Sequence, residues 1–319
     1  MKAVQTKATH HVQTGFTLIE LMISLVLGLL IVAAITQIYI TMVRTDLVQR
    51  GAGEIGDVSI FGIQNVEQKL RMANLGNPEN NIHQETDKGG VVLSQKNIGG
   101  AQNSVDKKYF THNPTSKSDD DGVSGTDKPS DTLTIQYINV TGAPMIDCES
   151  NVVDVNDHVI ERYFLRKSQV NGATGLALAC DAGRVDYRGI VTGTKATGTK
   201  VFGDSGSEMV LNVEQFKVLL GVQKKDTGQM VYISPSAYTA VTNKNFEKAP
   251  IVAIRFGMIV RSDKPIIGTD IPNTAIKVLG EDNTPTDSAS YIRKVYESTS
   301  MLRNARVIKI TVDNASETF

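Results

Sequence analysis

The sequence predicts an α+β fold in which one long N-terminal helix precedes a mostly antiparallel β-sheet domain. Residues 16–43 are almost entirely apolar, and 23 uncharged residues separate Glu20 from Arg44. Helical periodicity continues to about residue 75, and short segments of alternating polarity follow. The 319 residues are 40% hydrophobic and 21% charged, with a net charge of −1. These values exclude a disordered polyelectrolyte and a multi-span membrane protein, and they do not indicate nucleic acid as a partner.

The apolar stretch is long enough to cross a membrane. At about 1.5 Å per residue, its uncharged part spans roughly 30 Å as a helix. A signal peptide or a signal anchor is one interpretation. However, the stretch is longer than the apolar region of a secretory signal, and no cleavage site of small residues follows it. The processing point lies before the helix, between Gly15 and Phe16, which makes residues 1–15 a leader.

Glu20 is the one charge inside this apolar stretch. An unpaired carboxylate in such surroundings costs a few kcal/mol or more, so its presence predicts a partner. Cleavage after Gly15 frees an α-amino group on Phe16. In a helical array, Glu20 of one subunit could then neutralise the amino group of its neighbour.

Gly15 followed by Phe16-Thr17-Leu18-Ile19-Glu20-Leu21 resembles the class III signal of type IV prepilins and type II secretion pseudopilins. The resemblance implies cleavage after Gly15 by the prepilin peptidase, N-methylation of Phe16 and an assembly role for Glu20. It also implies a single-pass protein of the inner membrane with a periplasmic C-terminal domain, which becomes part of a surface pilus after assembly. Loss of residues 1–15, which hold two lysines and no acid, changes the net charge from −1 to −3.

Residues 44–76 continue the helix as an amphipathic segment. Small and apolar residues recur every three or four positions, at Val48, Ala52, Ile55, Ser59, Gly62, Val66, Leu70 and Ala73. This narrow stripe predicts packing against a sheet. The glycines at 51, 53, 56 and 62 either mark a softer segment of the helix or allow the sheet to approach closely. Gly76-Asn77-Pro78 ends the helix, giving a predicted element from Phe16 to Leu75 about 90 Å long.

Residues 77–319 form the predicted globular domain. Its strands are expected at Thr132–Val140, His158–Leu165, Leu176–Cys180, Val210–Val222, Ile251–Val260 and Arg306–Val312. Alternation in most of them favours antiparallel strands with one covered face. Residues 116–130 and 192–207 are polar and glycine-rich, which predicts surface loops.

Further segments resemble the large minor pilins of the PilW type. Lys69–Asn74 resembles the end of that family's long helix, and Val213–Phe216, leading to a Gly-Val turn at Leu220–Val222, resembles its central strand. Val252–Arg255 with Ile259–Ser262 resembles its penultimate strand. Arg293–Tyr296 with Met301–Asn304 resembles its C-terminal signature. The resemblance implies a structural minor pilin, not an enzyme, that helps to initiate pilus assembly in a tip-associated complex. The implied partners are other minor and major pilins, the inner-membrane assembly platform and a tip adhesin. Two alternatives remain: a J-type minor pseudopilin, and a signal-anchored periplasmic enzyme or binding module.

Cys148 and Cys180 are the two cysteines of the chain. A periplasmic location would allow a disulfide to persist between them. Closing this loop would contribute about 3–4 kcal/mol. The alternative is a pair of buried free thiols.

Short motifs that suggest catalysis or ligand binding each lack a required part. Gly203-Asp204-Ser205-Gly206-Ser207 resembles a serine-protease segment, but no histidine has the expected context. Residues 193–200 have the glycine spacing of a phosphate loop with the Lys-Thr order reversed. Residues 119–122 resemble part of a calcium loop, but lysines stand at its first and twelfth positions, which excludes an EF-hand. An irregular calcium site is the alternative to a solvated acidic loop. We therefore expect no cofactor, metal or catalytic residue, and the scattered cations Arg184, Arg188, Lys195 and Lys200 do not predict nucleic-acid binding.

Overall fold

The computed structural model describes residues 15–99, 105–118, 122–171, 175–186, 191–192, 202–240, 247–266 and 272–305. For residues 57–61 and 191–192, it describes the backbone alone. The chain divides into two compact units, one ending at Gln49 and the other beginning at Arg50. The predicted leader, apart from Gly15, and the strand expected at 306–312 lie outside the described residues, as does most of the loop expected at 192–207.

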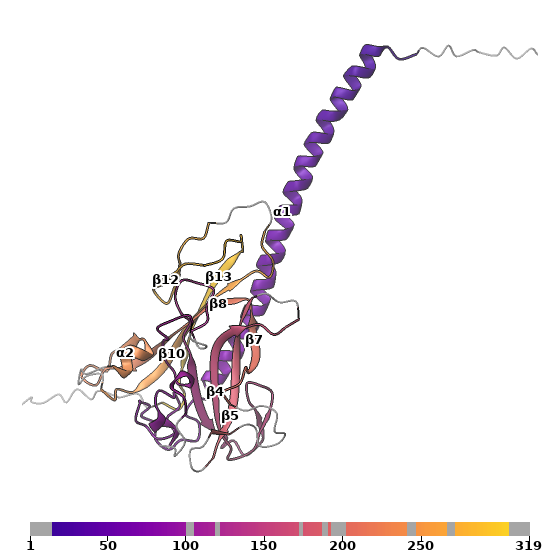
Figure 1. The fold of residues 1–319 in the computed structure, drawn as a ribbon. Coiled ribbons are helices and arrows are strands. Elements are labelled where there is room, and N and C mark those ends of the chain that lie inside the picture. The colour runs from indigo at the N-terminus through magenta and orange to yellow at the C-terminus, as the bar shows by residue number, and fades with distance from the viewer. Residues whose placement is uncertain are drawn as a thin grey trace, which may run out of the picture. The chain divides into compact units, whose positions relative to one another are not determined.

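The dominant element is helix α1 (Leu18–Leu70), which contains 53 residues (Figure 1). It is shorter at both ends than the predicted helix from Phe16 to Leu75. After Leu70 the chain continues in turns, in which the Met72 N–H donates to the Lys69 carbonyl at 2.9 Å. Asn74 and Gly76 then adopt left-handed φ values of 67° and 75°, which an α-helix does not contain.

The predicted apolar stripe is confirmed in the part of α1 that belongs to the second unit, with one correction. Ile55, Val66 and Leu70 are buried, whereas Ala52 is exposed and Gly51 takes the buried position beside Ser262. Gly62 is also buried, and a Cβ at this position would collide with the side chain of Val210. The glycine therefore permits the close approach of helix and strand that the sequence predicted.

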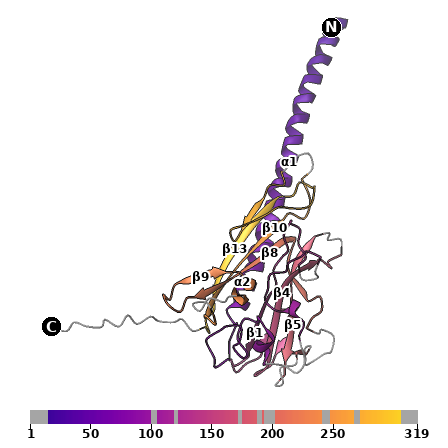
Figure 2. The same cartoon turned by 60° about the vertical axis from the view of Figure 1, so that its left-hand side comes forward.

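The strands form two antiparallel sheets and two short hairpins (Figure 2). The first sheet has the order β1 (Leu133–Ile138), β4 (His158–Lys167), β5 (Leu176–Val185) and β6 (Val191–Thr192), and β7 (Ser207–Leu211) also pairs with β5. The second sheet has the order β13 (Arg293–Met301), β10 (Ile251–Arg261), β8 (Val213–Gln223) and β9 (Met230–Ile233). The hairpins are β2 (Met145–Ile146) with β3 (Val152–Val153), and β11 (Ile276–Val278) with β12 (Glu281–Asn283).

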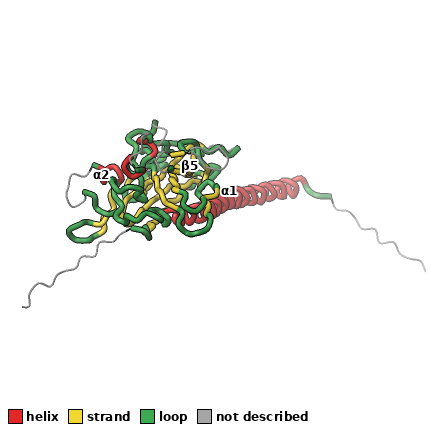
Figure 3. The backbone as a smooth tube through the Cα atoms, turned by 90° about the horizontal axis from the view of Figure 1, so that it is seen from below, coloured by secondary structure: helices red, strands yellow, loops and turns green. Residues whose placement is uncertain are grey.

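Short helical elements complete the described structure. They are α2 (Pro235–Thr239) and the 3₁₀ turns η1 (Gln95–Ile98) and η2 (Lys107–Tyr109). Figure 3 shows the strands gathered beside the C-terminal part of α1, which lies in the same unit.

Two strand predictions were wrong in detail. The expected strand Val210–Val222 is divided at Asn212, whose φ of 58° breaks the extended backbone, so that β7 and β8 join different sheets. Gly221 and Val222 form no turn, because both lie inside β8, where Gly221 pairs with Ala253 and Tyr232. Gly221 has no side chain, which lets the neighbouring strand approach closely, since a Cβ at this position would lie 2.8 Å from the Cβ of Ala253.

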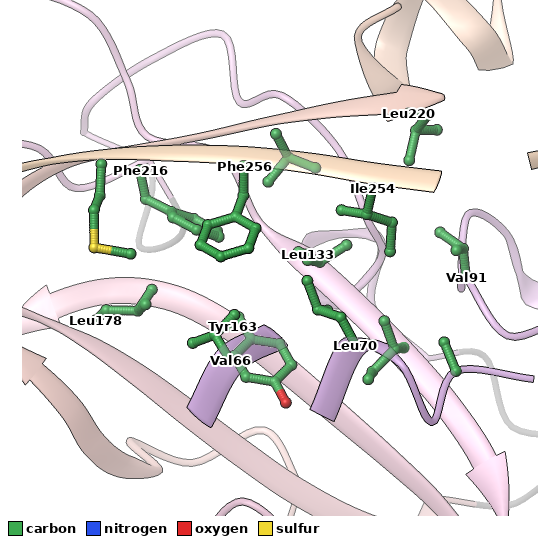
Figure 4. Close-up of a cluster of buried hydrophobic side chains, with 14 of the residues drawn as sticks. Val66, Leu70, Val91, Leu133, Tyr163, Leu178, Phe216, Leu220, Ile254 and Phe256 are labelled. Carbon is green, nitrogen blue, oxygen red and sulfur yellow. The ribbon is translucent and has the colours of Figure 1, made fainter. Parts of the chain in front are cut away.

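The main core fills the space between the two sheets and the C-terminal part of α1 (Figure 4). Val66 and Leu70 of the helix point toward Leu133 and Tyr163 of the first sheet and toward Phe256 of the second. All five side chains have 0% exposure. Burial of such side chains stabilises the fold by about 1.5–3 kcal/mol each, so this layer joins the end of α1 firmly to the β domain.

Candidate assembly site

The peptide bond between Gly15 and Phe16 lies immediately before the helix. Residues 15–17 are outside regular secondary structure, and Phe16 is 84% exposed. Among the described residues, and apart from its chain neighbours, no atom lies within 4 Å of a Cβ built on Gly15. The predicted cleavage bond is therefore accessible in the described part of the chain.

Glu20 makes a local contact at the start of α1 that sequence reasoning missed. The Thr17 hydroxyl accepts the Glu20 N–H at 3.3 Å, and it lies 3.4 Å from Glu20 Oε2, to which it can donate. The Thr17 carbonyl accepts the Leu21 N–H. This arrangement is similar to a capping box, whose signal is a Thr followed three positions later by Glu. It satisfies helix N–H groups but leaves the exposed Glu20 carboxylate without a cationic partner among the described residues.

The first unit exposes nearly all of its apolar surface. The large hydrophobic side chains from Phe16 to Val43 are 41 to 84% exposed. The hydroxyls of Ser24, Thr36 and Thr41 donate to helix carbonyls three or four residues earlier, at 2.8 to 2.9 Å. Those groups need no water, so this helix suits an apolar environment, and Leu18–Gly56 meets the length and composition of a membrane-crossing helix.

The cysteines form the disulfide that the sequence predicted. Cys148 follows β2 and Cys180 lies in β5, with their Cα atoms 6.1 Å apart. The bond ties the β2–β3 hairpin to the first sheet. The Lys69 ammonium at the end of α1 also donates to the Ile146 carbonyl in the same hairpin.

A buried carboxylate lies beside the disulfide. Glu161 is fully buried in β4 and accepts hydrogen bonds from the Tyr137 hydroxyl at 2.9 Å, the Tyr163 hydroxyl at 2.7 Å and the Cys148 N–H at 3.0 Å. Burial raises the pKa of Glu161, while Lys69 and the tyrosine hydrogen bonds oppose that rise. We call Glu161 and its three hydrogen-bond donors the buried polar hub. Its sequence signal was an acid, Glu161, within the predicted strand His158–Leu165, and the sequence analysis did not identify it.

Glu161 and the two cysteines do not provide a metal site. Cys148, Glu161 and Cys180 offer potential ligand atoms within 4.8 Å of one another, among the residues that the structure describes. Both sulfurs are joined in the disulfide, so neither is a thiolate.

The N-terminal geometry and the β domain each correspond to a known protein family. Residues 11–36 match the prokaryotic N-terminal methylation motif. Residues 162–304 match the family of type IV pilus-assembly protein W, PilW. The chain is similar to type IV pilin-like proteins of the PilW type. The matched range includes β8, β10 and β13, where the sequence resemblance was placed.

Other comparisons add little to this assignment. No curated protein matches the chain. Among solved structures, a type IV-like pilin from Thermus thermophilus is similar, with 13% identity, a TM-score of 0.31, and coverage of 56% of this chain and 81% of the other.

The PilW-type domain uses the protease-like segment as a structural loop. The Gly203 N–H donates to Asp181 Oδ2 at 2.8 Å, and Ser207 Oγ lies 3.4 Å from Glu149 Oε1. The ring of His83 accepts the Glu85 N–H at 3.1 Å, the ring of His112 lies 2.8 Å from the Phe110 carbonyl, and that of His158 lies 3.0 Å from the Gln136 amide oxygen. None of these three contacts involves Ser205.

The remaining ligand-binding motifs contribute little to this site. Arg184 is buried and paired with Asp147 at 3.0 Å and Asp157 at 3.6 Å, so it does not extend a basic surface. Arg188, Lys195, Lys200, the phosphate-loop-like segment and Asp119–Asp121 lie outside the described residues.

Proposed function

We propose that this PilW-type chain is a structural minor pilin that helps to initiate type IV pilus assembly within a tip-associated minor pilin complex. The observation that carries the proposal is an accessible Gly15–Phe16 bond, followed at once by an exposed apolar segment, residues 16–43, whose one acid, Glu20, has no cationic partner within the described part of the chain. A structural role, not an enzymatic one, agrees with the family match and with the loop contacts of Gly203 and Ser207.

The proposed sequence of events begins in the inner membrane. Residues 16–43 cross the bilayer, residues 44–76 lead out of it, and residues 77–319 fold in the periplasm. Prepilin peptidase cleaves after Gly15 and the new amino group of Phe16 is methylated. The apolar helix then leaves the lipid and packs among other pilin helices, which replace lipid as its apolar surroundings.

Glu20 supplies the specific step in this exchange. Its carboxylate would pair with the N-terminal amine of a neighbouring subunit, because two opposite charges in an apolar interior stabilise one another and neither is tolerated alone. The Thr17 contact is weak enough, at 3.4 Å, to be exchanged for that charged partner. The β domain would provide lateral contacts to other minor and major pilins, the assembly platform and a tip adhesin.

The mass of the mature N-terminus tests processing directly. Protein from cells with an active prepilin peptidase should lack residues 1–15 and carry one added methyl group. A Gly15→Leu variant is the control and should keep its leader. Retention of Met1 in the unmodified chain would contradict the proposal and favour a signal-anchored periplasmic protein.

Deletion in cells tests the assembly step. Loss of surface pili with normal type II secretion supports a minor pilin. Lost secretion with normal pili would instead identify a J-type pseudopilin.

A further inference from the structure

An open recess of about 450 Å³ lies in the second unit, beside the start of β8 and the end of β10. Its wall includes Glu214 of β8, Arg261 of β10, Gly175–Leu176 at the start of β5, and the segment Thr286–Tyr291. The residues that line this recess include none from helix α1 and neither cysteine of the disulfide, and nothing in the proposed assembly mechanism uses it.

Arg261 is the unusual residue of this recess. Its side chain is 7% exposed, and its guanidinium stacks on the ring of Tyr291 with 3.8 Å between the guanidinium carbon and the ring centroid. Nη1 is buried without a hydrogen-bond partner. The nearest carboxylate oxygen, Glu214 Oε1, is 3.6 Å from Nε, which is too far for a hydrogen bond. A guanidinium carries five N–H donors, and leaving them unsatisfied in a buried position is costly.

Glu214 does not satisfy Arg261 because it is engaged by another arginine. Arg293 donates from Nε to Glu214 Oε2 at 2.6 Å and from Nη2 to Oε1 at 3.1 Å. Arg293 also pairs with Asp287. Arg293 is therefore held between two carboxylates, whereas Arg261 is held by ring stacking and a longer ion pair.

The backbone around Arg261 is fitted closely to it. A Cβ added to Gly175 would lie 3.1 Å from Arg261 Nη2 and 2.6 Å from Asn212 Oδ1. The stacked ring and this glycine hold the guanidinium in one orientation. Such an arginine is prepared for an oxygen ligand without the entropy cost of ordering a flexible side chain.

We propose that this recess binds a carboxylate group, with Arg261 as its principal donor. The formal charges of Glu214, Asp287, Arg261 and Arg293 sum to zero, so no excess negative charge repels the incoming group. A carboxylate accepts charge-assisted hydrogen bonds from a guanidinium, and Arg261 is the arginine that lines the recess. The carboxylate comes either from an acidic peptide of a partner protein or from a small free carboxylic acid.

The test uses the full chain in detergent micelles with arginine side chains labelled with ¹⁵N. Acetate is titrated in parallel with acetamide, its uncharged counterpart, at constant ionic strength. We expect a saturable change in one arginine resonance with acetate at millimolar concentration and none with acetamide. Arg261→Gln should weaken acetate binding at least about tenfold, and Arg261→Lys should restore part of it.

Arg255→Gln is the matched control, because Arg255 lies on the same strand in an exposed ion pair with Glu297 at 2.7 Å. It should bind acetate within about twofold of the unmodified chain. Thermal unfolding of every variant verifies that each remains folded. No saturable response to acetate, or an unchanged response in folded Arg261→Gln, would overturn the proposal.

A second titration distinguishes the two sources of the carboxylate. An N-acetylated, C-amidated Gly-Asp-Gly peptide is compared with its Asn equivalent and with acetate. Tighter binding of the Asp peptide than of acetate assigns the recess to a protein partner, and equal or weaker binding assigns it to a small acid. Processing and piliation of Arg261→Gln are measured separately, so failure here does not depend on the assembly proposal.

Discussion

The backbone N–H of Cys148 donates to the buried carboxylate of Glu161 at 3.0 Å, directly beside the bond that joins Cys148 to Cys180. A covalent crosslink and a buried polar hub therefore fix the same hairpin to the same sheet. Both lie next to Lys69 at the end of α1, through its contact with Ile146. The disulfide and the hydrogen bonds to Glu161 therefore stabilise the hairpin that contacts the end of α1.

Removing the disulfide should destabilise the domain. The bond closes a loop between residues 32 positions apart. A Cys148→Ser, Cys180→Ser double variant should lose about 3–4 kcal/mol of unfolding free energy, because its unfolded chain is less restricted. Denaturant unfolding of the full chain in detergent measures this loss. Two reactive thiols in denatured, unreduced protein would show that the bond is absent.

Glu161→Gln should destabilise the fold by roughly 1–3 kcal/mol. The amide offers one acceptor oxygen in place of two, so at least one buried donor among Tyr137, Tyr163 and the Cys148 N–H loses its partner. Tyr163→Phe is the milder comparison, with an expected loss of about 1 kcal/mol. A Glu161→Gln protein that unfolds at the same denaturant concentration as the parent would contradict the hub.

His158 should make the domain less stable in mild acid. Burial lowers the pKa of His158 to about 4, with a smaller contribution from Lys88. In the unfolded chain the imidazole has a pKa of about 6.5, so protons bind the unfolded state first as the pH falls. This group should therefore cost roughly 2–3 kcal/mol of stability between about pH 6.5 and 4, and nothing above that window.

Unfolding curves at several pH values measure the effect, with His158→Gln as the comparison. The variant should lose this part of the pH dependence, because its side chain does not titrate. Equal slopes for the two proteins between pH 6.5 and 4 would contradict the assignment.

Substitution of two glycines of α1 by alanine should change the unfolding free energy in opposite directions. At Gly62 the new methyl group would collide with Val210, and we expect a loss of about 1–3 kcal/mol from overpacking. Gly53 is exposed in the same helix with open space around it, so Gly53→Ala should gain about 0.5–1 kcal/mol. Thermal unfolding of both variants tests the pair. If Gly62→Ala were also stabilising, the contact between helix and β7 would be looser than described.

The capping and assembly roles of Glu20 can be separated by two variants. Thr17→Ala removes the hydroxyl that contacts Glu20 but keeps the carboxylate, and should cost about 1 kcal/mol of helix stability with near-normal piliation. Glu20→Gln keeps a polar side chain but removes the charge, and should strongly reduce assembly while processing at Gly15 continues. Equal effects of the two variants on piliation would mean that Glu20 acts only as a helix cap.

The Gly15-Phe16 pair, the apolar residues to Val43 and the single acid Glu20 were sufficient to predict the helix and its prepilin-like character. These signals are local, because a run of hydrophobic residues and one misplaced charge can be read without knowing what packs beside them. The stripe of Ile55, Val66 and Leu70 was predictable for the same reason.

The tertiary structure decided what distant residues do to one another. It divided one apparent strand at Asn212, kept Gly221 within β8, and gathered three donors around Glu161. It also left the guanidinium of Arg261 stacked but without a hydrogen-bond partner for Nη1. Such relationships depend on which strands pair and how closely they approach. Strand pairing depends on residues from the whole chain, whereas the helix and its charge depend on consecutive residues.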